Sequence, residues 1–160
     1  MRFRKELAYE ADPDEVFAML ADPAFREKVA HAQEVVSVDV RLTTSSGGFS
    51  LVSDQVQNTK DLPAIAKKIT GDTTRAVVTE EWSSPTSGAI SITAPGKPSR
   101  AEGTITLEPD TTGTIEIVEL EVKVKVPLIG GKLEQLMADT IDSGYDVEHQ
   151  VGRAWLAGER

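Results

Sequence analysis

The chain has 160 residues, with 17 lysines and arginines, 26 aspartates and glutamates, and a formal net charge of −9. This length predicts a single domain, residues 1–160, with enough chain to bury a hydrophobic core. The acidic balance argues against nucleic acid as a partner, because phosphate binding needs a basic face. Cysteine is absent, which excludes disulfides, thiolate nucleophiles and thiolate metal ligands.

The chain shows no sign of membrane targeting. Its first residues, Met1 to Lys5, lack the apolar core of a signal peptide, and no apolar run reaches membrane-spanning length. We therefore expect a cytoplasmic protein without an integral membrane segment, either a monomer or a homodimer.

The first two thirds of the chain predict a strand, two short helices and a series of further strands. Residues 2–10 alternate in polarity, as in a strand. Asp12-Pro13 and Asp22-Pro23 each combine a capping side chain with a proline suited to the first helical turn. Alternation from Val35 onward then predicts strands at 36–42, 49–56, 74–82, 88–93, 100–107 and 114–126, with a short helical segment at 61–69.

The last third of the chain predicts a long amphipathic helix. Apolar residues recur at three- and four-residue steps from Leu133 to Trp155. The stripe narrows at its centre to Thr140 and Gly144, where a packing helix would carry large side chains. A helix held slightly off a curved sheet by small residues can enclose a cavity, so this pattern favours the binding of a small apolar molecule.

Gly130 and Gly131 lie between the last predicted strand and this helix. Glycine accepts backbone conformations and close contacts that other residues do not. We therefore expect the two glycines to let the chain turn sharply from the strand into the helix. Gly131→Val should destabilise the domain if the junction needs a positive φ or a close backbone approach there.

This layout, with the junction at 126–134, resembles the START-like superfamily, also called SRPBCC or birch-pollen-allergen-like. Asp61-Leu62-Pro63, Glu81-Trp82 and the Val-Pro-Leu-Ile-Gly-Gly junction make it most similar to an uncharacterised, mainly actinobacterial family of unknown function. The resemblance implies an α+β helix-grip fold. In this fold a curved antiparallel sheet of about seven strands wraps around a long C-terminal helix, and two short helices follow the first strand. Members of the superfamily include lipid carriers, quinone-binding proteins, polyketide cyclases and co-chaperones, so the fold implies no single reaction.

One carboxylate is expected on the concave face of the sheet. In strand 74–82 the more apolar register contains Ala76, Val78 and Trp82, and it places Glu80 on the same inner face. A carboxylate there must find a partner, reach water or acquire a raised pKa. Glu80 is either a ligand anchor or general base, or a strand-end residue at the cavity mouth.

Tyr145, Glu148 and His149 form a second candidate group on the long helix. Their spacing lets Tyr145 meet either of the other two, and these residue types move protons at neutral pH. The same pattern is also typical of a solvated helix edge. His31 is expected on the surface, and two distant histidines predict no metal site. The candidate ligand-binding residues are Glu80, Trp82, Ile90, Leu120, Met137, Thr140, Ile141, Gly144, Tyr145 and Glu148.

Three functions remain open. The first is a carrier of a small hydrophobic molecule such as a lipid, a quinone or a polyketide-like compound. The second is a cyclase, dehydratase or hydrolase that uses Glu80, Tyr145 or His149. The third is a co-chaperone-like interaction module. No cofactor or nucleophile motif occurs, and few titratable groups can converge. The sequence therefore favours the carrier and assigns no catalytic residue.

Overall fold

A computed structural model describes the whole chain, Met1 to Arg160. Seven strands form one antiparallel sheet in the order β1-β7-β6-β5-β4-β3-β2. The strands are β1 (Arg2–Tyr9), β2 (Ser37–Ser45), β3 (Gly48–Asn58), β4 (Thr73–Ser84), β5 (Ser87–Thr93), β6 (Ser99–Asp110) and β7 (Gly113–Val124). The helices are α1 (Pro13–Leu20), α2 (Pro23–Ala32), α3 (Ala64–Thr70) and α4 (Gly130–Leu156).

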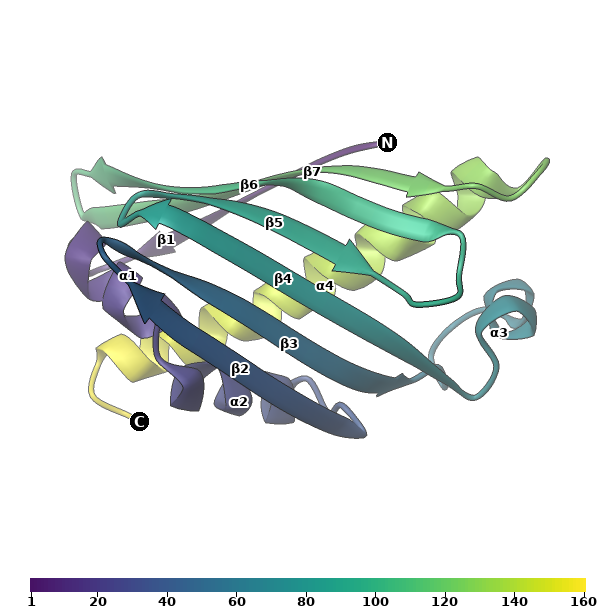
Figure 1. The fold of residues 1–160 in the computed structure, drawn as a ribbon, viewed down its shortest axis with the longest axis horizontal. Helices are drawn as coiled ribbons and strands as arrows, with labels where there is room; N and C mark the ends of the chain where they lie inside the picture. Colours follow the sequence, from purple (N-terminus) through teal and green to yellow (C-terminus); the bar gives the residue numbers. More distant parts are fainter.

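The helix α4 crosses one face of the curved sheet along its length (Figure 1). The helices α1 and α2 connect the edge strands β1 and β2 and lie near the C-terminal part of α4, whereas α3 lies at the opposite end of the molecule (Figure 1). The predicted α+β helix-grip fold is thus confirmed. None of the four helices has the length and apolar character needed to cross a membrane.

The two short helices begin as their sequences predict. Oδ1 of Asp12 accepts a hydrogen bond from the backbone N–H of Glu15, and Oδ1 of Asp22 accepts one from Ala24, both at 2.9 Å. Each helix starts with a proline, which has no N–H to leave unpaired. These caps fix where α2 begins, and therefore which of its side chains face the sheet.

The inner face of the sheet carries the hydrophobic core. The predicted inward register is confirmed in β6 and β7, where alternate residues are buried. At the end of the sheet near α1, the rings of Phe49 and Trp82 stack with centroids 5.4 Å apart. Phe25 of α2 meets Trp155 of α4 edge to face at 5.5 Å, so the end of α4 is packed against α2. This end of the molecule is therefore filled by side chains.

The junction between β7 and α4 differs from the prediction. Gly131 does not have a left-handed backbone, and a Cβ added to it would meet no atom within 4 Å. The left-handed residue is instead Leu128, with φ 70° and a fully exposed side chain. The close contact falls at Gly130, where an added Cβ would lie 2.7 Å from the carbonyl oxygen of Val124. Neither condition for the expected effect at Gly131 is met, because the left-handed residue Leu128 precedes the glycines and Gly131 already lies within α4.

Candidate functional site

A cavity of about 700 Å³ lies between the inner face of the sheet and α4. Its wall includes residues of α2, α3, β3 and β4 and the N-terminal two thirds of α4. The side chains of Leu51, Val78, Ile92, Met137 and Ile141 give the wall its apolar character. Residues of α3 and exposed residues of the loop before β6 line its outer end, and buried polar side chains line its inner end.

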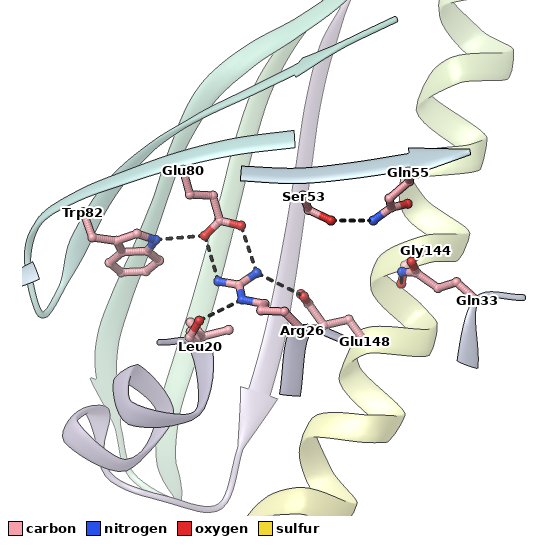
Figure 2. Close-up of polar contacts among 9 residues, drawn as sticks. All are labelled: Leu20, Arg26, Gln33, Ser53, Gln55, Glu80, Trp82, Gly144 and Glu148. Carbon is pink, nitrogen blue, oxygen red and sulfur yellow. Dashed lines mark hydrogen bonds and ion pairs between the residues drawn. The ribbon is translucent and has the colours of Figure 1, made fainter. Parts of the chain in front are cut away.

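Arg26 organises the inner end of this cavity (Figure 2). Its Nη1 and Nη2 atoms each donate a hydrogen bond to a different carboxylate oxygen of Glu80, both at 2.9 Å. Its Nε donates to the carbonyl oxygen of Leu20 at 2.7 Å. The Arg26 side chain is 9% exposed and that of Glu80 is 3% exposed, so this is a buried ion pair with two parallel bonds.

Glu80 is held from a second side as well. Nε1 of Trp82 donates a hydrogen bond to Oε1 of Glu80 at 2.8 Å. The register prediction that placed Glu80 on the inner face is therefore confirmed, and its partners are Arg26 and Trp82. Because the indole and the guanidinium both bind this carboxylate, Glu80 is fixed in position rather than free at the cavity mouth.

Glu148 of α4 approaches the same arginine but is held much less tightly. Its Oε1 lies 3.7 Å from Nη1 of Arg26, and the carboxylate forms no hydrogen bond, although its side chain is 8% exposed. Burial raises the pKa of Glu148 to about 7, against the opposing effect of Arg26. Glu148 thus places a carboxyl group in the cavity wall that gains or loses its proton near neutral pH.

Two more polar groups are buried behind this site. Oε2 of Glu116 and the hydroxyl of Tyr9 have no hydrogen-bond partner. Burial, reinforced by the charge of Glu148, raises the pKa of Glu116 well above its usual value, which favours the protonated acid. Extending the even-numbered alternation of β7 back from Val118 would have found Glu116 on the inner face.

A row of polar side chains on β3 forms another part of the wall. Nε2 of Gln55 donates to Oγ of Ser53, and Nε2 of Gln57 donates to Oε1 of Gln55, both at 3.0 Å. All three residues line the cavity. They alternate with outward residues along the strand, and this alternation in β3 was a usable signal that the prediction left out.

Gly144 and Thr140 mark the centre of α4. Both line the cavity. The carbonyl of Gly144 accepts a hydrogen bond from Nε2 of Gln33 at 2.9 Å, and a Cβ added to Gly144 would lie 3.4 Å from that atom. The hydroxyl of Thr140 donates to the carbonyl of Leu136 within the helix. Gly144 therefore gives room for Gln33, at the end of α2, to approach the helix.

The predicted ligand-binding residues separate into two sets. Those that line the cavity are Glu80, Met137, Thr140, Ile141, Gly144, Tyr145 and Glu148. Trp82, Ile90 and Leu120 lie in the packed core instead and are absent from the cavity wall. A ligand in this cavity would thus meet the helix side of the predicted site more than the sheet side.

The remaining titratable candidates lie apart from one another. Nε2 of His149 is 2.7 Å from the carbonyl oxygen of Ala8, and its ring meets that of Tyr9 edge to face, outside the cavity wall. His31 is exposed, as expected. Tyr145 lines the cavity, and burial raises the pKa of its hydroxyl well above the usual value. Tyr145 is therefore a neutral hydroxyl at neutral pH.

Arg26 is the main residue that sequence reasoning missed. It lies three and four residues before the buried Val29 and Ala30, so it shares their face of α2. A charged residue on an apolar stripe, together with an inward glutamate lacking a partner, was the available signal. The pairing itself joins residues 54 positions apart, which no local pattern specifies.

The fold is shared with several solved structures, and no curated protein matches the sequence. Protein TTHA0849 from Thermus thermophilus is 19% identical, with a TM-score of 0.69 over 98% of this chain and 97% of that one. The di-domain ARO/CYC StfQ from the steffimycin biosynthetic pathway is 14% identical, with a TM-score of 0.66 over 98% of this chain and 50% of that one. Ara h 8.0201 is 13% identical, with a TM-score of 0.63 over 98% and 97%.

At these identities the structural likeness concerns the fold, and it agrees with a START-like helix-grip architecture. The amino-acid sequence, unlike the fold, identifies a family. Residues 5–156 match the family described as protein of unknown function DUF2505. The chain therefore belongs to the DUF2505 family.

Proposed function

We propose that this protein binds a small, largely apolar molecule in the cavity between the sheet and α4. The observation that carries the proposal is the cavity itself, about 700 Å³ in volume. Ligand pockets for small molecules occupy roughly 300–1,000 Å³ and are mainly apolar, with a few polar groups that orient the ligand. The cavity fits both parts of this description.

The wall offers two kinds of interaction to such a ligand. Val78, Ile92 and Ile141 supply apolar surface, whose burial stabilises a complex by about 25 cal/mol per Å². Ser53, Tyr145 and Glu148 supply polar groups near the inner end. A ligand with an apolar body and one polar end would match this distribution.

Filling the cavity tests the proposal. Val78 lies on the inner face of β4 and lines the cavity, whereas its neighbour Val77 lies on the outer face. We expect Val78→Phe to weaken the binding of N-phenyl-naphthylamine, a neutral fluorescent probe, by about tenfold or more, because the ring occupies ligand space. Fluorescence titration measures the affinity.

Val77→Phe is the matched control, since it makes the same substitution one residue away on the opposite face of the sheet. It should leave probe affinity within about threefold of the wild type. Circular dichroism and thermal melts would verify that both variants fold. Equal affinity in both variants, or no saturable probe binding by the wild type, would refute the proposal.

A further inference from the structure

The inner end of the cavity is rich in acidic groups. Arg26 is the only cation there, and it faces the carboxyl groups of Glu80 and Glu148, with Glu116 buried behind them. The other cations that line the cavity, Lys60, Arg75 and Lys97, are all exposed at its outer end. An anionic head group at the inner end would therefore find no uncommitted cation.

Arg26 cannot readily serve an anionic ligand. Three of its N–H groups already bind Glu80 and the carbonyl of Leu20 (Figure 2). An incoming carboxylate could bind both Nη atoms of Arg26 in parallel only by displacing Glu80, which also holds the indole N–H of Trp82. Displacement would leave a carboxylate buried without a cation, which is strongly unfavourable.

Glu148 has the opposite character. Its carboxyl group lines the cavity, is more than nine tenths buried and accepts no hydrogen bond. A buried acceptor without a donor is unfavourable by itself and favours any ligand that supplies one. Tyr145, one turn earlier on α4, lies in the same wall, and its hydroxyl can accept a second donor.

We infer that the cavity selects amphiphiles whose head group donates hydrogen bonds to Glu148, a protonated amine most tightly, and that it excludes free carboxylates. This inference rests on the proposed binding function and specifies the ligand class. A protonated amine supplies three donors and a positive charge, an alcohol supplies one donor, and a carboxylate supplies none. The expected order of affinity is therefore amine, alcohol, carboxylate.

The protonation of Glu148 gives this selectivity a pH dependence. The charged and titratable groups around Glu148 are Arg26 from α2, Glu80 from β4, Glu116 from β7, Tyr9 from β1 and Tyr145 on its own helix. Burial raises the pKa of Glu148 to about 7. An amine requires the ionised carboxylate, so its affinity rises with pH through this range, whereas any residual affinity for a carboxylate falls.

Three ligands with the same alkyl chain test the inference: octylamine, octanol and octanoate. Each would compete with N-phenyl-naphthylamine for the full-length protein at about pH 6 and about pH 8. At the higher pH we expect octylamine to bind at least about tenfold more tightly than octanoate, with octanol between them. This preference should shrink at the lower pH.

Glu148→Gln should reduce the ratio of amine to carboxylate affinity to within about threefold at both pH values. Glu108→Gln is the matched control, because Glu108 is exposed on β6, lies outside the cavity wall and undergoes the same substitution. It should retain the wild-type ratio. The wild-type pH series provides a test that needs no substitution.

The outcomes separate the two claims. The inference would be overturned if octanoate bound as tightly as octylamine, or if the preference for the amine did not change with pH. The proposed function would still stand in that case if octanol bound tightly. Failure of all three ligands and of the neutral probe to bind would overturn both.

Discussion

Arg26 joins two side chains and one backbone carbonyl, each from a different element, in one buried cluster. It binds Glu80 of β4 and the carbonyl of Leu20 at the end of α1, and it lies 3.7 Å from Glu148 of α4. A buried ion pair contributes little compared with a well-packed apolar pair, but removing one partner leaves an isolated buried charge. The arginine is therefore important mainly because the carboxylates around it are already buried.

Arg26→Met should destabilise the protein by roughly 3–5 kcal/mol, because Glu80 loses its counter-ion and keeps only the indole N–H of Trp82. The double variant Arg26→Met/Glu80→Gln should recover part of this loss, since the amide oxygen still accepts from Trp82 and carries no charge. Urea unfolding of the two single variants and the double variant measures the coupling.

Asp54→Asn, which breaks the exposed pair with Arg75, serves as a comparison and should change stability little. If Arg26→Met unfolds at the same urea concentration as the wild type, the buried pair does not hold the cluster together.

At the scale of elements, the short link between β7 and α4 sets the position of the long helix. Leu128 has a left-handed backbone there, which is costly for a residue with a side chain. The side chain of Glu134 on the first turns of α4 accepts a hydrogen bond from the backbone N–H of Val124 at 3.0 Å. Together with the close contact at Gly130, this bond ties the start of α4 to the end of β7.

Substitution by alanine should change the stability of the protein in opposite directions at the two adjacent glycines of this link. Gly130→Ala should destabilise the protein by about 1–3 kcal/mol, because the new methyl group would lie 2.7 Å from the carbonyl oxygen of Val124. Gly131→Ala should stabilise it by about 0.4–1 kcal/mol, because the site is open and helical.

Thermal melts of the two variants under the same conditions would make the comparison. Equal shifts, or destabilisation by Gly131→Ala alone, would contradict the different surroundings assigned to the two glycines.

For the whole molecule, local patterns in the sequence predicted the elements but not all of their contacts. Alternation placed Glu80 on the inner face of β4, and the Asp-Pro pairs located both short helices. The same reasoning could not pair Glu80 with Arg26, because that contact depends on how α2 sits against the sheet. It also could not show that Gln33 occupies the space beside Gly144.

The cavity, too, was predicted only in part. Small residues at the centre of α4 correctly suggested that the helix does not pack uniformly on the sheet, but the wall extends to α3 and β3. Trp82 and Leu120 belong to the cluster of buried hydrophobic side chains and do not line the cavity. Packing among elements far apart in the sequence decides which inward residues belong to the core and which line the cavity. The pattern of a single strand does not predict this.

The buried acids give the whole molecule a characteristic dependence of stability on pH. Burial raises the pKa of Glu148 from 4.5 to about 7, so the folded state binds more protons than the unfolded state between these values. The free energy of unfolding therefore falls as pH rises through this window, by about 3 kcal/mol from Glu148. Glu116, whose pKa is also raised, acts in the same direction.

Glu148→Gln removes this contribution, because an amide cannot ionise. Near pH 4.5 the variant and the wild type should have similar stability, since Glu148 is then protonated in the folded wild type. Above pH 7 the variant should become the more stable protein, by up to about 3 kcal/mol. Urea unfolding across this range measures the difference, and the same substitution at the exposed Glu108, Glu108→Gln, should show no such divergence. A constant difference between Glu148→Gln and the wild type at every pH would mean that Glu148 is not the group whose ionisation destabilises the fold.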